Sequence, residues 1–138
     1  MSDAPPIRLA VVGAHLRGQP LHHQLTDLDA TFVAETTTAP CYRLYALDTT
    51  PPKPGLRRVA EGDPAGAAVA VEVYELTAEA FGRFVDAIPE PLGICRVRLA
   101  DGTDVAGFGC EEIGWLDATE ITSFGGWRAY RSAAAPPG

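Results

Sequence analysis

The chain has 138 residues, a length typical of one domain, and 46% of them are hydrophobic while 21% are charged. This composition supports a packed core and argues against extensive disorder. The formal net charge of −7, without a basic stripe, excludes nucleic acid as an expected partner, because a phosphate backbone would be repelled. No apolar run approaches the ~18 residues of a membrane span, so no membrane association is expected.

The cysteines and the start of the chain indicate a cytoplasmic protein. Residues 1–6 have neither the basic nor the apolar region of a secretory signal. Cys41, Cys95 and Cys110 are odd in number and lack C-x-x-C spacing, which argues against a disulfide framework. Each lies among apolar residues, so we expect them to fill the core as free thiols, with Cys110 as a mild exception because it lies where a strand meets Glu111 and Glu112.

The first part of the chain predicts a strand, a tight loop and a short helix. Residues 7–12 are apolar and β-branched, as in a buried strand, and they end in a turn between Gly13 and Gly18. Pro20 suits the first turn of a helix in which leucines recur at helical spacing. Two further strands are expected, around residues 31–36 and 42–47.

The middle of the chain predicts a long loop, a strand and a helix. Residues 48–68 are rich in Pro, Gly and Ala and are expected to be loop, with a short strand at 56–59 left open. Residues 69–76 alternate as a strand does. Thr77 then caps a helix. Its apolar face consists of Phe81, Phe84, Val85 and Ile88.

The last third predicts a hairpin and a terminal element. Residues 93–99 and 104–110 flank an Asp-Gly pair at 101–102, which is a strong hairpin turn signal. Residues 121–130 form either a terminal helix or a packing arm. Strands outnumber helices, so the predicted class is α+β, with a mixed or antiparallel sheet or a small barrel and a few short helices.

Separated motifs of the chain resemble one family in the right order. They include GAHLRGQPLHHQL at 13–25, TAPCYRLYAL at 38–47, PPKPGL at 51–56, AFGRFVDAIPEPLGI at 80–94 and EITSFGGWRAY at 120–130. Together they resemble the γ-glutamylcyclotransferase-like fold, and more specifically the C-terminal domain of allophanate hydrolases. The resemblance implies one domain over residues 1–132, followed by a flexible tail at 133–138.

One departure separates the chain from cyclotransferases. Those proteins carry a general acid/base Glu shortly after the helix, whereas this chain has Pro89 at the matching position. Glu90 follows one residue later, between two prolines, and a carboxylate displaced in this way generally points elsewhere. The sequence therefore predicts against cyclotransferase activity.

The loop at 13–17 is the main predicted site. A strand end followed by glycine and a helix start leaves backbone N–H groups that favour an anion, although the same pattern also occurs in routine turns. We expect Gly13, Ala14, Leu16 and Arg17 to bind substrate. His15 is the predicted general acid, because imidazole titrates near neutral pH, with a surface histidine as the alternative.

Other candidates lie farther along the chain. His23, on the short helix, is a second catalytic candidate, and Tyr42, Lys53 and Arg128 are candidate substrate-binding residues. Core packing for Tyr42, a solvated Lys53 and a structural cap for Arg128 stay open as alternatives. The crowded histidines lack metal-ligand spacing, so neither a metal nor another cofactor is expected.

Three functions remain open at this stage. The resemblance implies an enzyme that acts on a small N-carboxylated, urea-like or carbamate-like anion, with C–N cleavage and decarboxylation as in the second step of allophanate breakdown. The alternative is a non-catalytic ligand-binding or assembly module for an amidase-type partner protein. A γ-glutamyl-amine cyclotransferase-like lyase is the weaker alternative, and a homodimer is left open.

Overall fold

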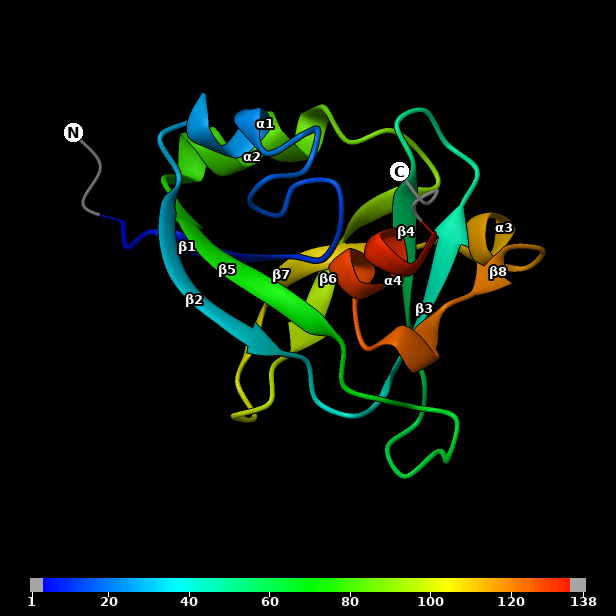
Figure 1. Ribbon diagram of the computed structural model, residues 1–138. Helices are drawn as coiled ribbons and strands as arrows, with labels where there is room; N and C mark the ends of the chain where they lie inside the picture. The colour runs from blue at the N-terminus through cyan, green and yellow to red at the C-terminus, as the bar shows by residue number, and fades with distance from the viewer. Residues whose placement is uncertain (1–3, 135–138) are drawn as a thin grey trace.

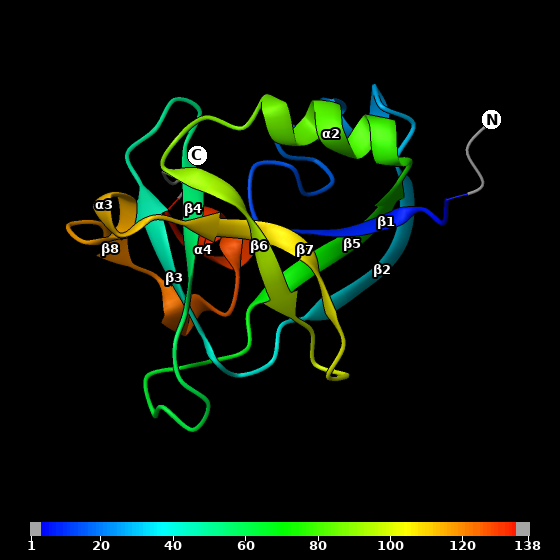
Figure 2. The same ribbon diagram turned by 180° about the vertical axis from the view of Figure 1, so that it is seen from behind.

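The computed structural model describes residues 4–134, and its larger sheet has five strands (Figures 1 and 2). In spatial order these are β2 (Thr31–Thr37), β5 (Ala70–Leu76), β1 (Ile7–Val11), β7 (Asp104–Cys110) and β6 (Leu92–Arg98). β1 pairs with β7 in parallel, and the other neighbours are antiparallel. The mixed sheet confirms the predicted α+β class.

A smaller sheet has the order β4 (Lys53–Arg58), β3 (Tyr42–Leu47) and β8 (Thr119–Glu120). The sequence predicted loop over most of the β4 segment, whereas the strand begins at Lys53, which pairs with Leu47. Because β4 is at an edge of this sheet, Pro54 can occupy a strand position without depriving an interior ladder of a donor. This correction places Lys53 on a strand rather than in a loop.

The helices are short: α1 (His23–Thr26), α2 (Ala78–Asp86), α3 (Glu112–Trp115), the 3-10 turn η1 (Thr122–Phe124) and α4 (Trp127–Ala134). Thr77 caps α2 as predicted, since its Oγ1 accepts from the Ala80 N–H at 3.1 Å. α1 and α2 lie at the same end of the molecule, while the β3–β4 sheet and α3 lie at the other (Figures 1 and 2). α3 has only four residues and has no counterpart among the elements predicted from the sequence.

The cysteines depart from the prediction of a common core role. Cys41 is buried, Cys110 is half-buried and Cys95 is exposed. Cys95 lies on β6, which is an edge strand of the larger sheet. All of them are free thiols. Residues 133 and 134 of the expected tail belong to α4, and the rest of that tail lies outside the described residues.

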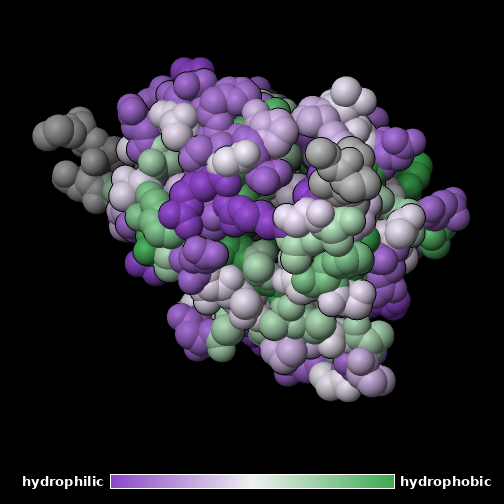
Figure 3. Space-filling model, viewed as in Figure 1, coloured by the Kyte–Doolittle hydropathy of each residue, from purple (hydrophilic) through white to green (hydrophobic). Residues whose placement is uncertain are grey.

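The surface mixes polar and apolar residues. Figure 3 shows hydrophilic residues over the α1–α2 end of this face and a more hydrophobic area over α4 and η1. Among residues 4–134, no helix has the length and apolarity needed to cross a membrane. The same residues contain no group of three or more His, Cys, Asp and Glu side chains arranged to hold a metal ion.

Candidate active site

The loop that follows β1 packs tightly against β4. A Cβ atom added to Gly13 would lie 2.1 Å from Cδ of Pro54, so only glycine allows this approach. The contact brings the loop next to Lys53, the first residue of β4. Gly13 is therefore explained by close backbone packing.

His15 is buried in this loop, with 7% of its surface exposed. Its ring stacks on Phe108 of β7 at 5.0 Å between centroids and meets the edge of Phe84 of α2 at 5.1 Å. Nε2 of His15 donates to Oε1 of Gln24 at 2.8 Å. Because an amide oxygen only accepts, this bond assigns the proton to Nε2 and leaves Nδ1 without a partner among residues 4–134.

The environment of His15 disfavours its charged form. Burial lowers the pKa of His15 below its ordinary value of 6.5, and the nearby charge of Lys53 acts in the same direction, while the hydrogen bond to Gln24 opposes them. The imidazole is therefore mostly neutral at pH 7. A bound anion would shift the balance, since a negative charge beside the ring favours its protonation.

Lys53 is the only lysine in the chain and is 8% exposed. Within residues 4–134 its ammonium group has no hydrogen bond and no carboxylate partner. No side-chain nitrogen in this part of the chain is both fully buried and unpartnered, so Nζ must retain some contact with the cavity solvent. A mostly buried, uncompensated charge is costly, and such groups mark functional sites.

Several backbone donors of the loop are also unpaired. The N–H groups of Gly13, Ala14 and His15 have no hydrogen-bond partner in the described part of the chain, although all three residues are buried. By contrast, the Leu16 N–H donates to the Gly13 carbonyl at 3.0 Å. A buried N–H without a partner costs about 1–3 kcal/mol, so these donors are suited to receive an anion.

A cavity of about 220 Å³ lies beside this loop. His15 and Lys53 both line it. The remaining walls include Leu21, Gln24, Pro51, Ile88, Leu92 and Phe108. A small adjoining recess continues along Gly13 and Ala14 to Lys53 and Pro54. Drug-sized ligands occupy roughly 300–1,000 Å³, so this cavity suits a molecule of fewer atoms.

Comparison with known proteins bears on this site. The family model of the allophanate hydrolase C-terminal domain matches residues 7–132. The chain belongs to this family. Urea amidolyase from Saccharomyces cerevisiae is 47% identical over 128 residues, which cover 90% of this chain but only 7% of that protein. The chain therefore spans only a small part of the curated relatives it matches.

Solved structures agree with this membership. Kluyveromyces lactis allophanate hydrolase superposes with a TM-score of 0.89 at 42% identity, covering 98% of this chain and 23% of that chain. A uropathogenic E. coli-specific protein superposes at 0.85 with 32% identity, covering 96% of this chain and all of its own. An AIG2-like protein from Mus musculus, at 0.61 and 19% identity over 86% of this chain and 87% of that chain, shows the γ-glutamylcyclotransferase-like fold alone.

The cyclotransferase position identified in the sequence lies at this cavity. Pro89, which the resemblance places at the Glu position of cyclotransferases, is among the lining residues. Glu90, the neighbouring carboxylate, is exposed and does not line the cavity. The lining of this cavity thus includes a cationic side chain and a neutral imidazole, and none of the described residues that line it is a carboxylate.

The structure brings some predicted site residues together and separates others. His15 and Lys53 line the same cavity, and Gly13 and Ala14 line the small recess that adjoins it. His23 is exposed, and its Nδ1 is 3.1 Å from the Pro20 carbonyl oxygen, outside the cavity lining. These distances concentrate the candidate chemistry on a single histidine.

The other predicted binding residues contact different parts of the fold. Tyr42 is buried, and its hydroxyl oxygen accepts from the Arg98 N–H at 2.9 Å. Leu16 and Arg128 line a second cavity, of about 290 Å³. Arg17 and Arg128 both bind Glu72. None of these four lines the His15 cavity.

Sequence reasoning missed Gln24 and Phe108, which hold the His15 ring. Gln24 follows His15 at a distance of nine residues, across a turn whose geometry the sequence does not specify. Phe108 reaches the ring because β7 pairs with β1, a contact between segments about a hundred residues apart. The parallel pairing of β1 and β7, once known, would have pointed to Phe108.

Proposed function

We propose that this domain decarboxylates a small N-carboxylated carbamate-like anion, with His15 as the proton donor. The observation that carries the proposal is the buried, uncompensated Lys53 beside a neutral His15 at a small cavity. Membership of the allophanate hydrolase C-terminal domain family supports the same class of substrate. The second step of allophanate breakdown has the chemistry that such a site can perform.

The reaction requires one proton at nitrogen. In N-carboxycarbamate, a nitrogen bears two carboxylates, and breaking one C–N bond releases carbon dioxide while the bonding electrons remain on nitrogen. That nitrogen takes a proton and becomes the amine of carbamate. An imidazolium at His15 would supply this proton, and the anion that it serves would itself favour the protonated ring.

Lys53 and the loop would hold the carboxylates. The ammonium group supplies a compensating charge, and the N–H groups of Gly13, Ala14 and His15 supply donors whose directions the fold fixes. Phe84 and Phe108 enclose the ring and limit the access of water. Electrostatic interactions are stronger in such a site than in bulk solvent.

An amidase would supply the substrate. The sequence relatives carry this domain within much larger proteins named urea amidolyase and allophanate hydrolase. We propose that an amidase-type protein or domain works with this chain, because N-carboxycarbamate must be formed before it can be consumed. The site itself requires only the small anion.

The test generates the substrate in place. An isolated amidase domain would hydrolyse allophanate, and carbon dioxide release would be followed with and without this protein. We expect the protein to accelerate the release of carbon dioxide. His15→Asn should lower the catalysed rate by about 100-fold, as expected for the loss of a general acid. Lys53→Met should lower the catalysed rate most at low substrate concentrations, because it weakens substrate binding.

Matched substitutions make the test specific. Arg96→Met removes an exposed positive charge on β6, away from the cavity lining, and should leave the acceleration intact. His23→Asn separates the two candidate histidines. If His15→Asn retained the full rate of release, or if the wild-type protein left the decay unchanged, the decarboxylation proposal would be wrong.

A further inference from the structure

A second polar cluster lies behind the His15 loop, centred on Glu72. This β5 residue is buried, with 1% of its surface exposed, and pairs with Val11 at the end of β1. Its Oε1 accepts from the Arg17 N–H at 3.0 Å and from the Tyr74 hydroxyl at 2.9 Å. Its Oε2 accepts from Nε of Arg17 at 3.2 Å and from Nη2 of Arg128 at 2.8 Å.

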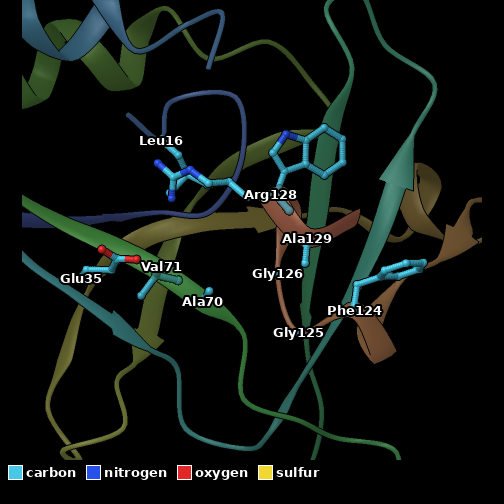
Figure 4. Close-up of a pocket in the computed structure, with 10 residues that line it drawn as sticks. Leu16, Glu35, Ala70, Val71, Phe124, Gly125, Gly126, Arg128 and Ala129 are labelled. Atoms are coloured by element: carbon cyan, nitrogen blue, oxygen red, sulfur yellow. The ribbon is translucent and has the colours of Figure 1, made fainter. Parts of the chain in front are cut away.

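The main chain of Arg17 is held on both sides. Its N–H donates to Glu72, and its carbonyl oxygen accepts from Nη2 of Arg128 at 2.6 Å. Arg128 comes from α4, and Figure 4 shows its guanidinium extending from that helix toward Leu16. The residue two positions after His15 is thereby fixed to both β5 and α4.

The cluster is electrically balanced. Arg17 and Arg128 carry the positive charges, and Glu72 and Glu35 carry the negative ones, with Arg17 Nη2 at 3.1 Å from Glu35. Burial acts to raise the pKa of Glu72, but hydrogen bonds from Arg17, Arg128 and Tyr74 outweigh it and lower the pKa. The guanidinium groups are thus engaged with this carboxylate rather than presented to the His15 cavity.

We propose that Glu72 and Arg128 are positioning residues for His15: they clamp the main chain of Arg17 and so fix the loop that carries the imidazole and the unpaired N–H groups. This inference rests on the proposed function of His15. A displacement of about 1 Å at a reacting group can cost on the order of 100-fold in rate, so a loop without helical or strand support needs such an anchor. Neither residue lines the His15 cavity.

Two substitutions test the clamp. Glu72→Gln places an amide N–H₂ group against the arginine donors, and Arg128→Lys keeps the charge but cannot donate to Glu72 and to the Arg17 carbonyl in the same fixed geometry. If Glu72→Gln fails to fold, Arg128→Lys still gives the answer. Arg98→Met is the matched control, because Arg98 forms surface ion pairs with Glu61 and Asp104, outside the clamp.

The readouts are local. In either clamp variant, the rate of amide hydrogen exchange at Leu16 and Arg17 should rise. The factor of this rise should be on the order of tenfold larger than the factor in the β1–β5 ladder, because only the loop is released. By NMR, the His15 ring should titrate closer to its ordinary range as water enters. The catalysed release of carbon dioxide should fall by roughly 10- to 100-fold. Arg98→Met should change none of these.

The clamp and the proposed function fail in different ways. Exchange at Leu16 and Arg17 that changes only in step with global stability, with an unaltered His15 titration, would show a purely structural role and overturn the inference. Activity that survives in His15→Asn would overturn the proposed function, while the exchange and titration measurements would still decide whether the clamp exists.

Discussion

The His15 cavity and the Glu72 cluster adjoin the same loop, but they differ in whether their charged and polar groups are paired. In the cavity, Lys53 has no counter-charge and the loop donors have no hydrogen-bond partner among residues 4–134. In the cluster, both oxygens of Glu72 accept hydrogen bonds and the charges balance. Satisfied buried groups stabilise a fold, whereas unsatisfied ones persist where a ligand is to be bound. Substitutions in the two regions should therefore change the free energy of unfolding in opposite directions.

The largest change in the free energy of unfolding is expected in the Glu72 cluster. Glu72→Gln should lower the free energy of unfolding by about 2–3 kcal/mol, somewhat less than for a fully buried pair because Arg17 and Arg128 reach water. Urea denaturation followed by circular dichroism measures this. Glu79→Gln, in an exposed pair with Arg83, should change it by only ~0.3 kcal/mol. Equal effects of the two substitutions would contradict the contrast.

A change of opposite sign in the free energy of unfolding is expected at the His15 cavity. Lys53→Met replaces an uncompensated charge with an apolar side chain of similar length and should raise the free energy of unfolding by about 1–2 kcal/mol. We expect a small dicarboxylate such as malonate to stabilise the wild type, and the same substitution should abolish that stabilisation. Thermal denaturation with and without malonate measures both. A destabilised Lys53→Met would mean that Lys53 has a structural partner.

The lowered pKa of His15 predicts how the stability of the fold changes with pH. Its pKa is lowered in the folded state, so the unfolded chain binds the proton more readily. The contribution of the neutral ring is complete above pH 6.5, and it is lost as the pH falls from 6.5 through the lowered pKa. His15→Gln should flatten this part of the stability profile between pH 7 and the acid limb. An unchanged slope would show that the ring is not buried as neutral imidazole.

Tyr74 offers the smallest and most local test. Tyr74→Phe removes the hydroxyl donor to Glu72 but leaves the arginine contacts in place. The loss should be about 1 kcal/mol, the usual value of one hydrogen bond, with little change in carbon dioxide release. Denaturation and rate measurements on the same sample check it. A rate loss as large as that of Glu72→Gln would place Tyr74 within the clamp.

The elements with strong local signals were predicted well. The Asp-Gly turn fixed the β6–β7 hairpin to within a residue or two, and the cap at Thr77 marked the start of α2. β4 was missed in part, because Pro and Gly around Lys53 are loop formers and the pairing with β3 overrides them. α3 has four residues, too few to produce a periodic pattern.

The same distinction applies to the site. His15 and Gly13 lie in one continuous motif, so the sequence could identify them. Glu72 could not be identified, because a glutamate alternating with valines in a strand usually faces solvent. Its burial depends on Arg17 and Arg128, which are more than fifty residues away in opposite directions along the chain. Only the three-dimensional arrangement of β5, the loop and α4 brings these partners together.

The sole lysine gives the molecule an unusual chemical profile. Amine-directed reagents label many surface positions on most proteins, but here the only side-chain amine lies at the His15 cavity. Lysine-specific isotope labelling would therefore yield a single side-chain resonance that reports on the site. Conversely, amine-reactive cross-linkers would find almost no anchor on the outer surface of this domain. A partner amidase would have to be captured through carboxylates or through the exposed Cys95.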